Sequence, residues 1–239
     1  MSDSLDGKSV LVTGASRGIG KEIAQIYAEV GVYVVGTRTA KGECRSPCNE
    51  WIIADFSNED HIYRCADEIK ELKPDILINN AGINTIGSFV SLDPKEFQKI
   101  QQVNVFAPFL FSQSVVPAMK SRGWGRIVNI SSIWGKIGKE GRAPYAASKF
   151  ALDGITLSIA AEHSKDGILA NCVAPGFTDT ELTRRVLGED GIRQLTDMVP
   201  ARRMASPREI AHFVYWLGSN QNSYITGQNI AIDGGFARV

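Results

Sequence analysis

The sequence predicts an α/β fold: a single doubly wound, Rossmann-type domain with helices on both faces of a parallel sheet of about seven strands. Three observations predict it. Short, almost continuously apolar runs alternate with longer amphipathic runs along the whole chain, which is typical of a parallel sheet buried on both faces. No Pro/Ser-rich linker, charge block or internal repeat interrupts the alternation. The length of 239 residues suits one domain over residues 1–239.

In the first half of the chain, short β-branched runs predict strands at 10–13, 32–37, 51–54 and 76–78. The run after the first strand predicts a helix at 18–30, because four apolar residues recur at helical spacing: Ile19, Ile23, Ile26 and Tyr27. A second amphipathic run predicts a helix at 59–72, which Pro74 ends.

In the second half, residues 94–121 predict one long helix that Pro108 and Pro117 bend. A helix at 144–163 carries Pro144 in its first turn, where proline is favoured. The remaining runs predict strands at 126–130, 169–173 and 229–232 and a helix at 207–217. Residues 177–206 interrupt the rhythm after the carboxyl end of a strand, where such sheets bind ligands. They are a candidate substrate lid, with an ordinary surface insertion as the alternative.

Composition and charge narrow the classes of function. Hydrophobic residues make up 44% and charged residues 22% of the chain, which excludes a disordered or fibrous protein. The 26 Lys and Arg residues balance the 26 Asp and Glu residues, so no broadly basic nucleic-acid-binding surface is expected. No apolar run approaches the roughly 18 residues of a membrane-spanning helix. The polar segment 1–8 lacks the pattern of a signal peptide. We therefore expect a soluble, cytoplasmic protein with no nucleic-acid or membrane partner.

Cysteines and histidines give no sign of a metal site. The four cysteines are too few and too irregularly spaced for a disulfide scaffold: Cys44, Cys48, Cys65 and Cys172. The first two could form half of a zinc site, but no second Cys or His pair lies nearby at ligand spacing. We predict no metal and interpret the pair as thiols in a loop. The three histidines are interpreted as helix-surface residues: His61, His163 and His212.

A glycine-rich turn joins the first strand to the first helix. In TGASRGIG (13–20) the glycines stand at positions 14, 18 and 20. A backbone that turns sharply and approaches a pyrophosphate tolerates little side chain at these positions. The helix N-terminus then offers free N–H groups and a partial positive charge to phosphates. Any tight strand–helix turn could carry such glycines, but this position at the start of the domain predicts dinucleotide binding.

The end of the second strand indicates which dinucleotide is bound. An NAD-binding chain usually carries an acid about 20 residues after the loop, where it accepts from ribose hydroxyls. Here Arg38 stands in that place, and Arg17 projects from the glycine loop. Two guanidiniums can pair with a 2′-phosphate, so NADP(H) is favoured over NAD(H). Solvated surface arginines are the alternative.

A tyrosine and a lysine four residues apart open the helix at 144–163. Tyr145 and Lys149 therefore share one helix face. A phenol with a pKa of about 10 is a poor base at neutral pH, and a nearby ammonium lowers that pKa. Ser131 and Ser132 end the preceding strand, and either could reach the same edge of the sheet. Trp134 and Ile137 follow and could shape a substrate pocket or merely pack the loop.

Taken together, these motifs resemble the short-chain dehydrogenase/reductase family over essentially the whole chain. The resemblance rests on seven ordered features: TGASRGIG (13–20), NNAG (79–82), Asn104, Ser132 thirteen residues before Tyr145, YAASK (145–149), PG (175–176) and ITGQNIAIDGG (225–235). The most similar subgroup looks like the bacterial 3-oxoacyl-carrier-protein reductases and their relatives with other substrates.

The resemblance implies a role for each matching residue. Tyr145 would be the general acid and base, and Ser132 would bind the substrate oxygen. Lys149 would hold the nicotinamide ribose and lower the tyrosine pKa, and Asn104 would hold a water of a proton relay. The implied cofactor contacts are Gly14, Ser16, Arg17, Gly18, Ile19, Gly20, Arg38, Asp55, Asn80, Ala81, Gly82, Tyr145, Lys149, Pro175, Gly176, Thr178 and Thr180.

Two departures from the subgroup bear on adenine binding and on the substrate. The stretch between Arg38 and Asp55 is several residues shorter than usual, so the usual second helix is expected to be shortened or lost. The carrier-protein reductases commonly have an Arg-Gly-Ile segment before the sixth strand, where the acidic carrier docks. Here Asp166 replaces that arginine, with Lys165 and Arg122 as the nearest compensating cations. A carrier-bound substrate is therefore less favoured.

The sequence thus predicts an NADP(H)-dependent reductase of a small carbonyl compound, or dehydrogenase of the alcohol, such as a 3-oxoacyl thioester or a sugar derivative. A non-catalytic dinucleotide-binding sensor or scaffold is the alternative, and epimerisation or dehydration on the same fold is a third. Relatives pair their long helices and C-terminal strands across two-fold axes, so the resemblance also implies a homotetramer. Surplus apolar residues in three segments fit such pairing: 94–121, the helix from Tyr145, and the chain end with Phe236.

Overall fold

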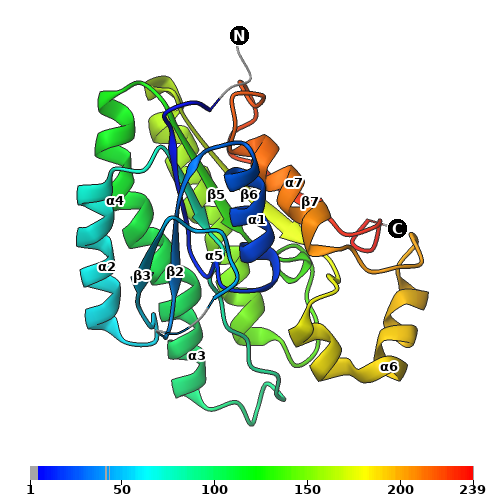
Figure 1. The fold of residues 1–239 in the computed structure, drawn as a ribbon. Coiled ribbons are helices and arrows are strands. Elements are labelled where there is room, and N and C mark those ends of the chain that lie inside the picture. The colour runs from blue at the N-terminus through cyan, green and yellow to red at the C-terminus, as the bar shows by residue number, and fades with distance from the viewer. Residues whose placement is uncertain (1–4, 41, 43, 239) are drawn as a thin grey trace.

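Seven parallel strands form one twisted sheet at the centre of the molecule (Figure 1). The computed structural model describes residues 5–40, 42 and 44–238, so the start of the polar N-terminal segment, with Asp3, lies outside the described residues. The strand order is β3-β2-β1-β4-β5-β6-β7, and every neighbouring pair is parallel. The strands are β1 Ser9–Val12, β2 Tyr33–Arg38, β3 Glu50–Ile53, β4 Ile76–Asn79, β5 Gly125–Ile130, β6 Ile168–Pro175 and β7 Asn229–Ile232. The predicted fold class is confirmed.

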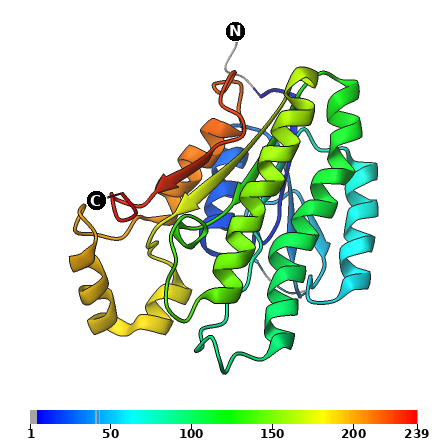
Figure 2. The ribbon, with the colours of Figure 1, turned by 180° about the vertical axis from the view of Figure 1, so that it is seen from behind.

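Helices cover both faces of the sheet. Their bounds are α1 Gly18–Glu29, α2 Glu59–Leu72, α3 Pro94–Gln101, α4 Ala107–Ser121, α5 Ala143–His163, α6 Glu181–Met198 and α7 Pro207–Leu217. One face packs on α1 and α7 through Ile23, Tyr27 and Val214. The other face packs on α2 and α4, with α5 beside them (Figure 2). Within the described residues, no helix is both long and apolar enough to cross a membrane.

The prediction of one helix at 94–121 is wrong in one respect. The segment consists of two helices, α3 and α4, which are joined by a π-helical turn, η1 (Gln102–Phe106). Within this turn the Ala107 N–H donates to the Gln102 carbonyl, five residues back. Pro108 has no N–H, so the Asn104 carbonyl lacks its usual α-helical donor. The i→i+5 hydrogen bonding of the π-helical turn accommodates this missing bond. Pro117 lies inside α4 without ending it.

The connection between β2 and β3 contains no helix in the part that the structure describes, as the shortened sequence predicted. It runs beside the first strand–helix turn instead. The thiol of Cys44 lies 3.7 Å from the Ser16 carbonyl oxygen. Cys48 fills space that a side chain at Gly36 would need, since a Cβ there would lie 2.6 Å from its sulfur.

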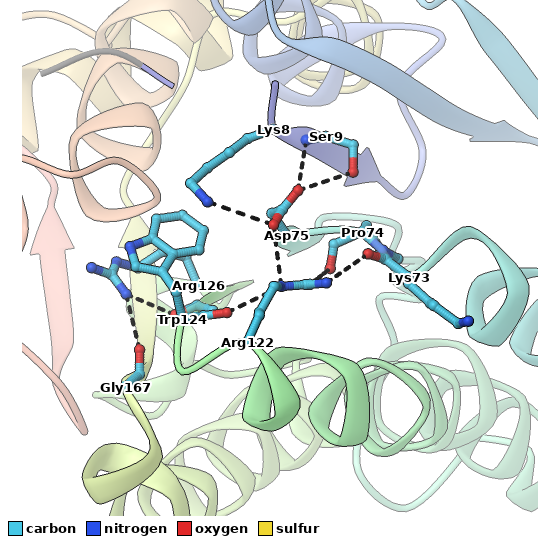
Figure 3. Close-up of polar contacts among 10 residues, drawn as sticks. Lys8, Ser9, Lys73, Pro74, Asp75, Arg122, Trp124, Arg126 and Gly167 are labelled. Atoms are coloured by element: carbon cyan, nitrogen blue, oxygen red, sulfur yellow. Dashed lines mark hydrogen bonds and ion pairs between the residues drawn. The ribbon is translucent and has the colours of Figure 1, made fainter. Parts of the chain in front are cut away.

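A polar cluster closes the opposite, amino-terminal edge of the sheet (Figure 3). The Asp75 carboxylate accepts from the Ser9 N–H at 3.0 Å and lies 3.1 Å from the Arg122 guanidinium. Arg122 also donates to the carbonyls of Lys73 and Pro74. The buried Arg126 donates to four carbonyls, those of Gly125, Gly167, Ser219 and Asn222. Hydrogen bonds of this kind offset the free-energy cost of burying a cation. We therefore interpret the residues at this edge as stabilising the fold.

Candidate active site

The carboxyl ends of β1, β2, β4, β5 and β6 bring the predicted site residues to one edge of the sheet. The glycine turn follows β1, Arg38 ends β2, and Asn80 to Gly82 follow β4. Ser132 follows β5, and the segment from Pro175 to Thr180 leads from β6 into α6. Tyr145 and Lys149 reach this edge from the first turns of α5.

The glycine turn has the backbone that its sequence predicted. Gly14 and Gly18 adopt φ of +67° and +57°, which strongly favours glycine. A Cβ on Gly20 would lie 2.3 Å from the Gly14 carbonyl oxygen, so no side chain fits there. Arg17 precedes α1 in an extended conformation without a side-chain cap, and the first turn of α1 has no acid. The N-terminus of α1 is therefore available to an anion.

Two threonines hold this turn against its neighbouring strands, and sequence reasoning missed both. The Thr13 hydroxyl accepts from the N–H groups of Asn80, at 2.9 Å, and Ala81, at 3.0 Å. The Thr37 hydroxyl accepts from the Gly14 N–H at 3.0 Å. Both threonines are buried at strand ends. A polar residue closing an apolar run was the available signal.

On the adenosine side, Arg38 stacks on an aromatic ring. Its guanidinium carbon lies 4.8 Å from the centre of the Trp51 ring, and Nη1 donates to the Gly42 carbonyl at 2.6 Å. The Arg38 Nε atom is buried without a hydrogen-bond partner. A buried donor without a partner is costly, so this guanidinium retains binding capacity for an anion.

Asp55 lies beyond the end of β3. Hydrogen bonds from the Ser57 N–H and hydroxyl, at 2.9 and 2.8 Å, hold the Asp55 pKa below its usual value. The Asp55 N–H donates to Nδ1 of His61 at 3.2 Å. His61 therefore has a partner at this edge, which its position on a helix did not reveal.

Ser132 lies close enough to Tyr145 to act on its pKa, and the surroundings of the phenol act on that pKa in opposite directions. Burial raises the pKa of Tyr145, whereas a hydrogen bond with Ser132 and the positive charge of Arg142 lower it. Burial is the largest of these effects, so the Tyr145 pKa lies above its ordinary value, and the lowering expected of Lys149 stays a prediction. Arg142 was not singled out from the sequence.

Lys149 is almost fully buried, at 3% exposure. Its Nζ donates to the Ile130 carbonyl at 2.8 Å and lies 5.4 Å from the centre of the Tyr145 ring. Burial lowers its pKa to about 8. The Ser131 hydroxyl donates to the Lys149 carbonyl at 3.2 Å. The two serines are thereby distinguished, because Ser131 anchors α5 and Ser132 meets the tyrosine.

Asn104 lies in the π-helical turn, fully buried. Its side-chain amide accepts from the Ile83 N–H and donates to the Ile83 carbonyl, both at 2.9 Å. It also donates to the Ser148 hydroxyl at 3.0 Å. A Cβ on Gly82 would lie 3.4 Å from Asn104 Oδ1 and 3.6 Å from Lys149 Nζ, so these two side chains flank Gly82. Both amide N–H groups of Asn104 have acceptors. Its main-chain carbonyl lacks the α-helical donor, because residue 108 is a proline.

The segment after β6 is packed closely. A Cβ on Gly176 would lie 2.7 Å from the Asp233 Cα, which accounts for the glycine by packing alone. Thr178 donates its hydroxyl to the Gly176 carbonyl at 3.2 Å, and the Thr180 hydroxyl caps α6 by accepting from the Thr183 N–H at 3.2 Å. Trp134 packs against Phe177 and Phe236 with ring centres 6.1 and 6.0 Å apart.

The chain is similar to known proteins over almost its whole length. A family model described as Enoyl-(Acyl carrier protein) reductase matches residues 14–237. The 3-oxoacyl-[acyl-carrier-protein] reductase FabG of Vibrio cholerae is 37% identical over 240 residues, which cover 97% of this chain and 98% of that protein.

Two solved structures are also similar. A structure assigned as an NAD(P)-dependent gluconate 5-dehydrogenase of Beutenbergia cavernae, with bound NADP, has a TM-score of 0.92 and 32% identity, with 99% of each chain covered. A gluconate 5-dehydrogenase of Burkholderia cenocepacia, in complex with NADP and tartrate, has a TM-score of 0.90 and 29% identity, with 99% of this chain and 97% of that chain covered.

Proposed function

The chain belongs to the short-chain dehydrogenase/reductase family, and from that premise we propose an NADP(H)-dependent oxidoreductase that reduces the carbonyl group of a small substrate or oxidises the corresponding alcohol. One observation carries the proposal. Ser132, Tyr145 and Lys149 converge at the edge of the sheet onto which the glycine turn opens. A sensor or scaffold has no need of this convergence of a buried lysine, a tyrosine and a serine.

The residues at this edge fit a dinucleotide. The missing side chain at Gly20, the positive φ of Gly14 and Gly18 and the uncapped N-terminus of α1 suit a pyrophosphate. Arg38, with its unpartnered Nε, suits a 2′-phosphate, and Arg17 is exposed on the same turn. Asp55 and the loops from Asn80 to Gly82 and from Pro175 to Thr180 would complete the cleft.

Arg38→Asp should weaken NADPH binding and improve NADH binding, because it removes a phosphate partner and supplies a ribose acceptor. The KM values for NADPH and NADH, measured with one carbonyl substrate, give the preference before and after the change. Arg64→Gln, an exposed arginine on α2, serves as the control. An unchanged preference would show that Arg38 makes no contact with the 2′-phosphate.

The bound cofactor supplies or accepts the hydride, and the chain controls position and protons. We infer that Tyr145 gives its phenolic proton to the carbonyl oxygen while Ser132 donates a hydrogen bond to the same oxygen. Lys149 would hold the nicotinamide ribose through Nζ. Asn104 would hold a water at its main-chain carbonyl, and that water would pass a proton to Lys149.

Residues 177–206 would act as a substrate lid on a single-domain chain. Both ends of the segment pair with each other, since Ala205 N–H donates to the Phe177 carbonyl at 2.9 Å and Asp179 N–H to the Ala205 carbonyl at 2.8 Å. Between these ends α6 stands to one side of the sheet (Figure 1). Such a closed base would let α6 move without disturbing β6 and β7.

An assay of NADPH consumption against a panel of carbonyl compounds tests the function. The panel includes a 3-oxoacyl thioester and a keto derivative of gluconate, the substrate types named for the relatives. Net NADPH consumption with any member supports a reductase. Absence of consumption together with measurable NADPH binding would favour a sensor or an isomerase.

We also propose a homotetramer formed by two-fold pairing. Of the apolar residues that suggested it, Val103, Phe111 and Leu152 lie in the core. Phe109, Phe150 and Leu157, on α4 and α5, remain 47%, 48% and 51% exposed. Light scattering at micromolar concentration should give about four times the 26.0 kDa of one chain. A mass near 26.0 kDa would contradict the assembly.

A further inference from the structure

Arg142 is a half-buried cation placed one helical turn before Tyr145. It occupies the N-cap position of α5 but makes no side-chain cap hydrogen bond. Its main chain is fixed, because its N–H donates to the Lys139 carbonyl and its carbonyl accepts from the Ala146 N–H at 2.8 Å. The Arg142 guanidinium lies near enough to the Tyr145 phenol for the two groups to interact electrostatically.

The Arg142 guanidinium has no anionic partner among the described residues. None of their ion pairs and side-chain hydrogen bonds involves it. Arg126, by contrast, is satisfied by four carbonyls, and Arg203 and Arg208 pair with carboxylates. A cation withdrawn from water without a partner is costly. Burial accordingly lowers the Arg142 pKa.

The surroundings of Arg142 belong to the substrate side of the site. The Gly87 N–H donates to the carbonyl of Gly141 at 3.2 Å, so the loop that follows Gly82 borders Arg142. The segment 136–142 contains three cations and one acid, the exposed Glu140. Nζ of Lys136 is tied to the Asn229 carbonyl at 2.7 Å. Arg142 is therefore the cation that lies beside the reacting phenol with its donors free.

We propose that Arg142 binds a carboxylate of the substrate, so that this site prefers carbonyl compounds that carry a carboxylate a few atoms from the carbonyl. The inference rests on the proposed function and assigns the substrate class for the same site. A guanidinium offers a planar fork of donors that matches a carboxylate. An anion held there is aligned with Tyr145 and Ser132 and satisfies the free donors.

A matched substrate pair separates this role from an effect of Arg142 on the Tyr145 pKa. Acetoacetate and ethyl acetoacetate have the same 3-oxo group, but only the first carries a charge. Arg142→Gln should raise KM for acetoacetate about 10- to 100-fold and leave KM for ethyl acetoacetate within about twofold. Arg142→Lys should fall between, because an ammonium keeps the charge but loses the fork. Arg64→Gln is the control.

Binding of malonate in the presence of NADP, measured by calorimetry, tests the inference without turnover. The wild type should bind malonate, and Arg142→Gln should bind it at least about tenfold more weakly. Equal losses for both ketones, or malonate binding that is absent from the wild type or unchanged in the variant, would overturn the role of Arg142. Failure of the wild type to reduce any carbonyl would instead overturn the proposed function, while malonate binding still decides the inference.

Discussion

Replacing Tyr145 by Phe should lower turnover by about 10²- to 10⁴-fold, the usual contribution of a general acid–base group. The change removes only the hydroxyl, which is the transferable proton of the proposed mechanism. The ring and its position on α5 remain, so the fold and NADPH binding should persist. Steady-state rates of NADPH oxidation measure the loss, and NADPH fluorescence titration measures binding.

Tyr224→Phe is the matched control, because Tyr224 is a tyrosine that is 93% exposed in the loop leading to the amino end of β7. It should keep wild-type rates. Near-wild-type turnover of Tyr145→Phe, with melting temperature and NADPH affinity unchanged, would show that another group supplies the proton. Ser132 would then be the first group to test, since it lies close enough to Tyr145 to lower the pKa of the phenol.

The alternation of apolar runs predicted all seven strands and their parallel arrangement, because burial on both faces leaves a plain mark on a strand. No strand end differs from its predicted position by more than two residues. The π-helical turn at Gln102–Phe106 could not be predicted from periodicity. This turn depends on the N–H that Pro108 lacks and on the hydrogen bonds of the buried Asn104 amide. One of those bonds goes to Ser148, which is 44 residues away in the sequence, so local periodicity does not reveal it.

The residues of the candidate site also fall into those that the sequence predicted and those that it did not. Motifs located Ser132, Tyr145, Lys149 and the glycine turn, because their chemistry requires those residue types at fixed spacing. The groups that orient them left no such mark. Thr13 meets Asn80 across 67 residues, and a threonine there could equally have faced solvent. Arg142 was missed because one arginine before a helix usually indicates only a solvated surface.

Lys149→Met should abolish most turnover and yet raise the thermal stability of the protein at neutral pH. Burial lowers the Lys149 pKa to about 8 from an ordinary value of 10.5, so the folded state disfavours the ammonium. A pKa shift of that size lowers the free energy of unfolding by about 3 kcal/mol at pH values below the folded-state pKa. Losing the hydrogen bond to Ile130 offsets about 1–2 kcal/mol of that gain. A rise in Tm of roughly 2–8 °C is expected at pH 7.

The pH dependence of this gain identifies its cause. Below about pH 8 the lysine is charged in both the folded and the unfolded states, so the full penalty applies. Between about pH 8 and 10.5 only the unfolded state holds the proton, and wild-type stability therefore rises with pH. The advantage of Lys149→Met over the wild type should shrink across that window. Lys95→Met, at an exposed position on α3, should show no such trend. A variant destabilised equally at pH 7 and pH 10 would mean that the bond from Nζ to Ile130 outweighs the charge, and that Lys149 stabilises the fold as well as serving the reaction.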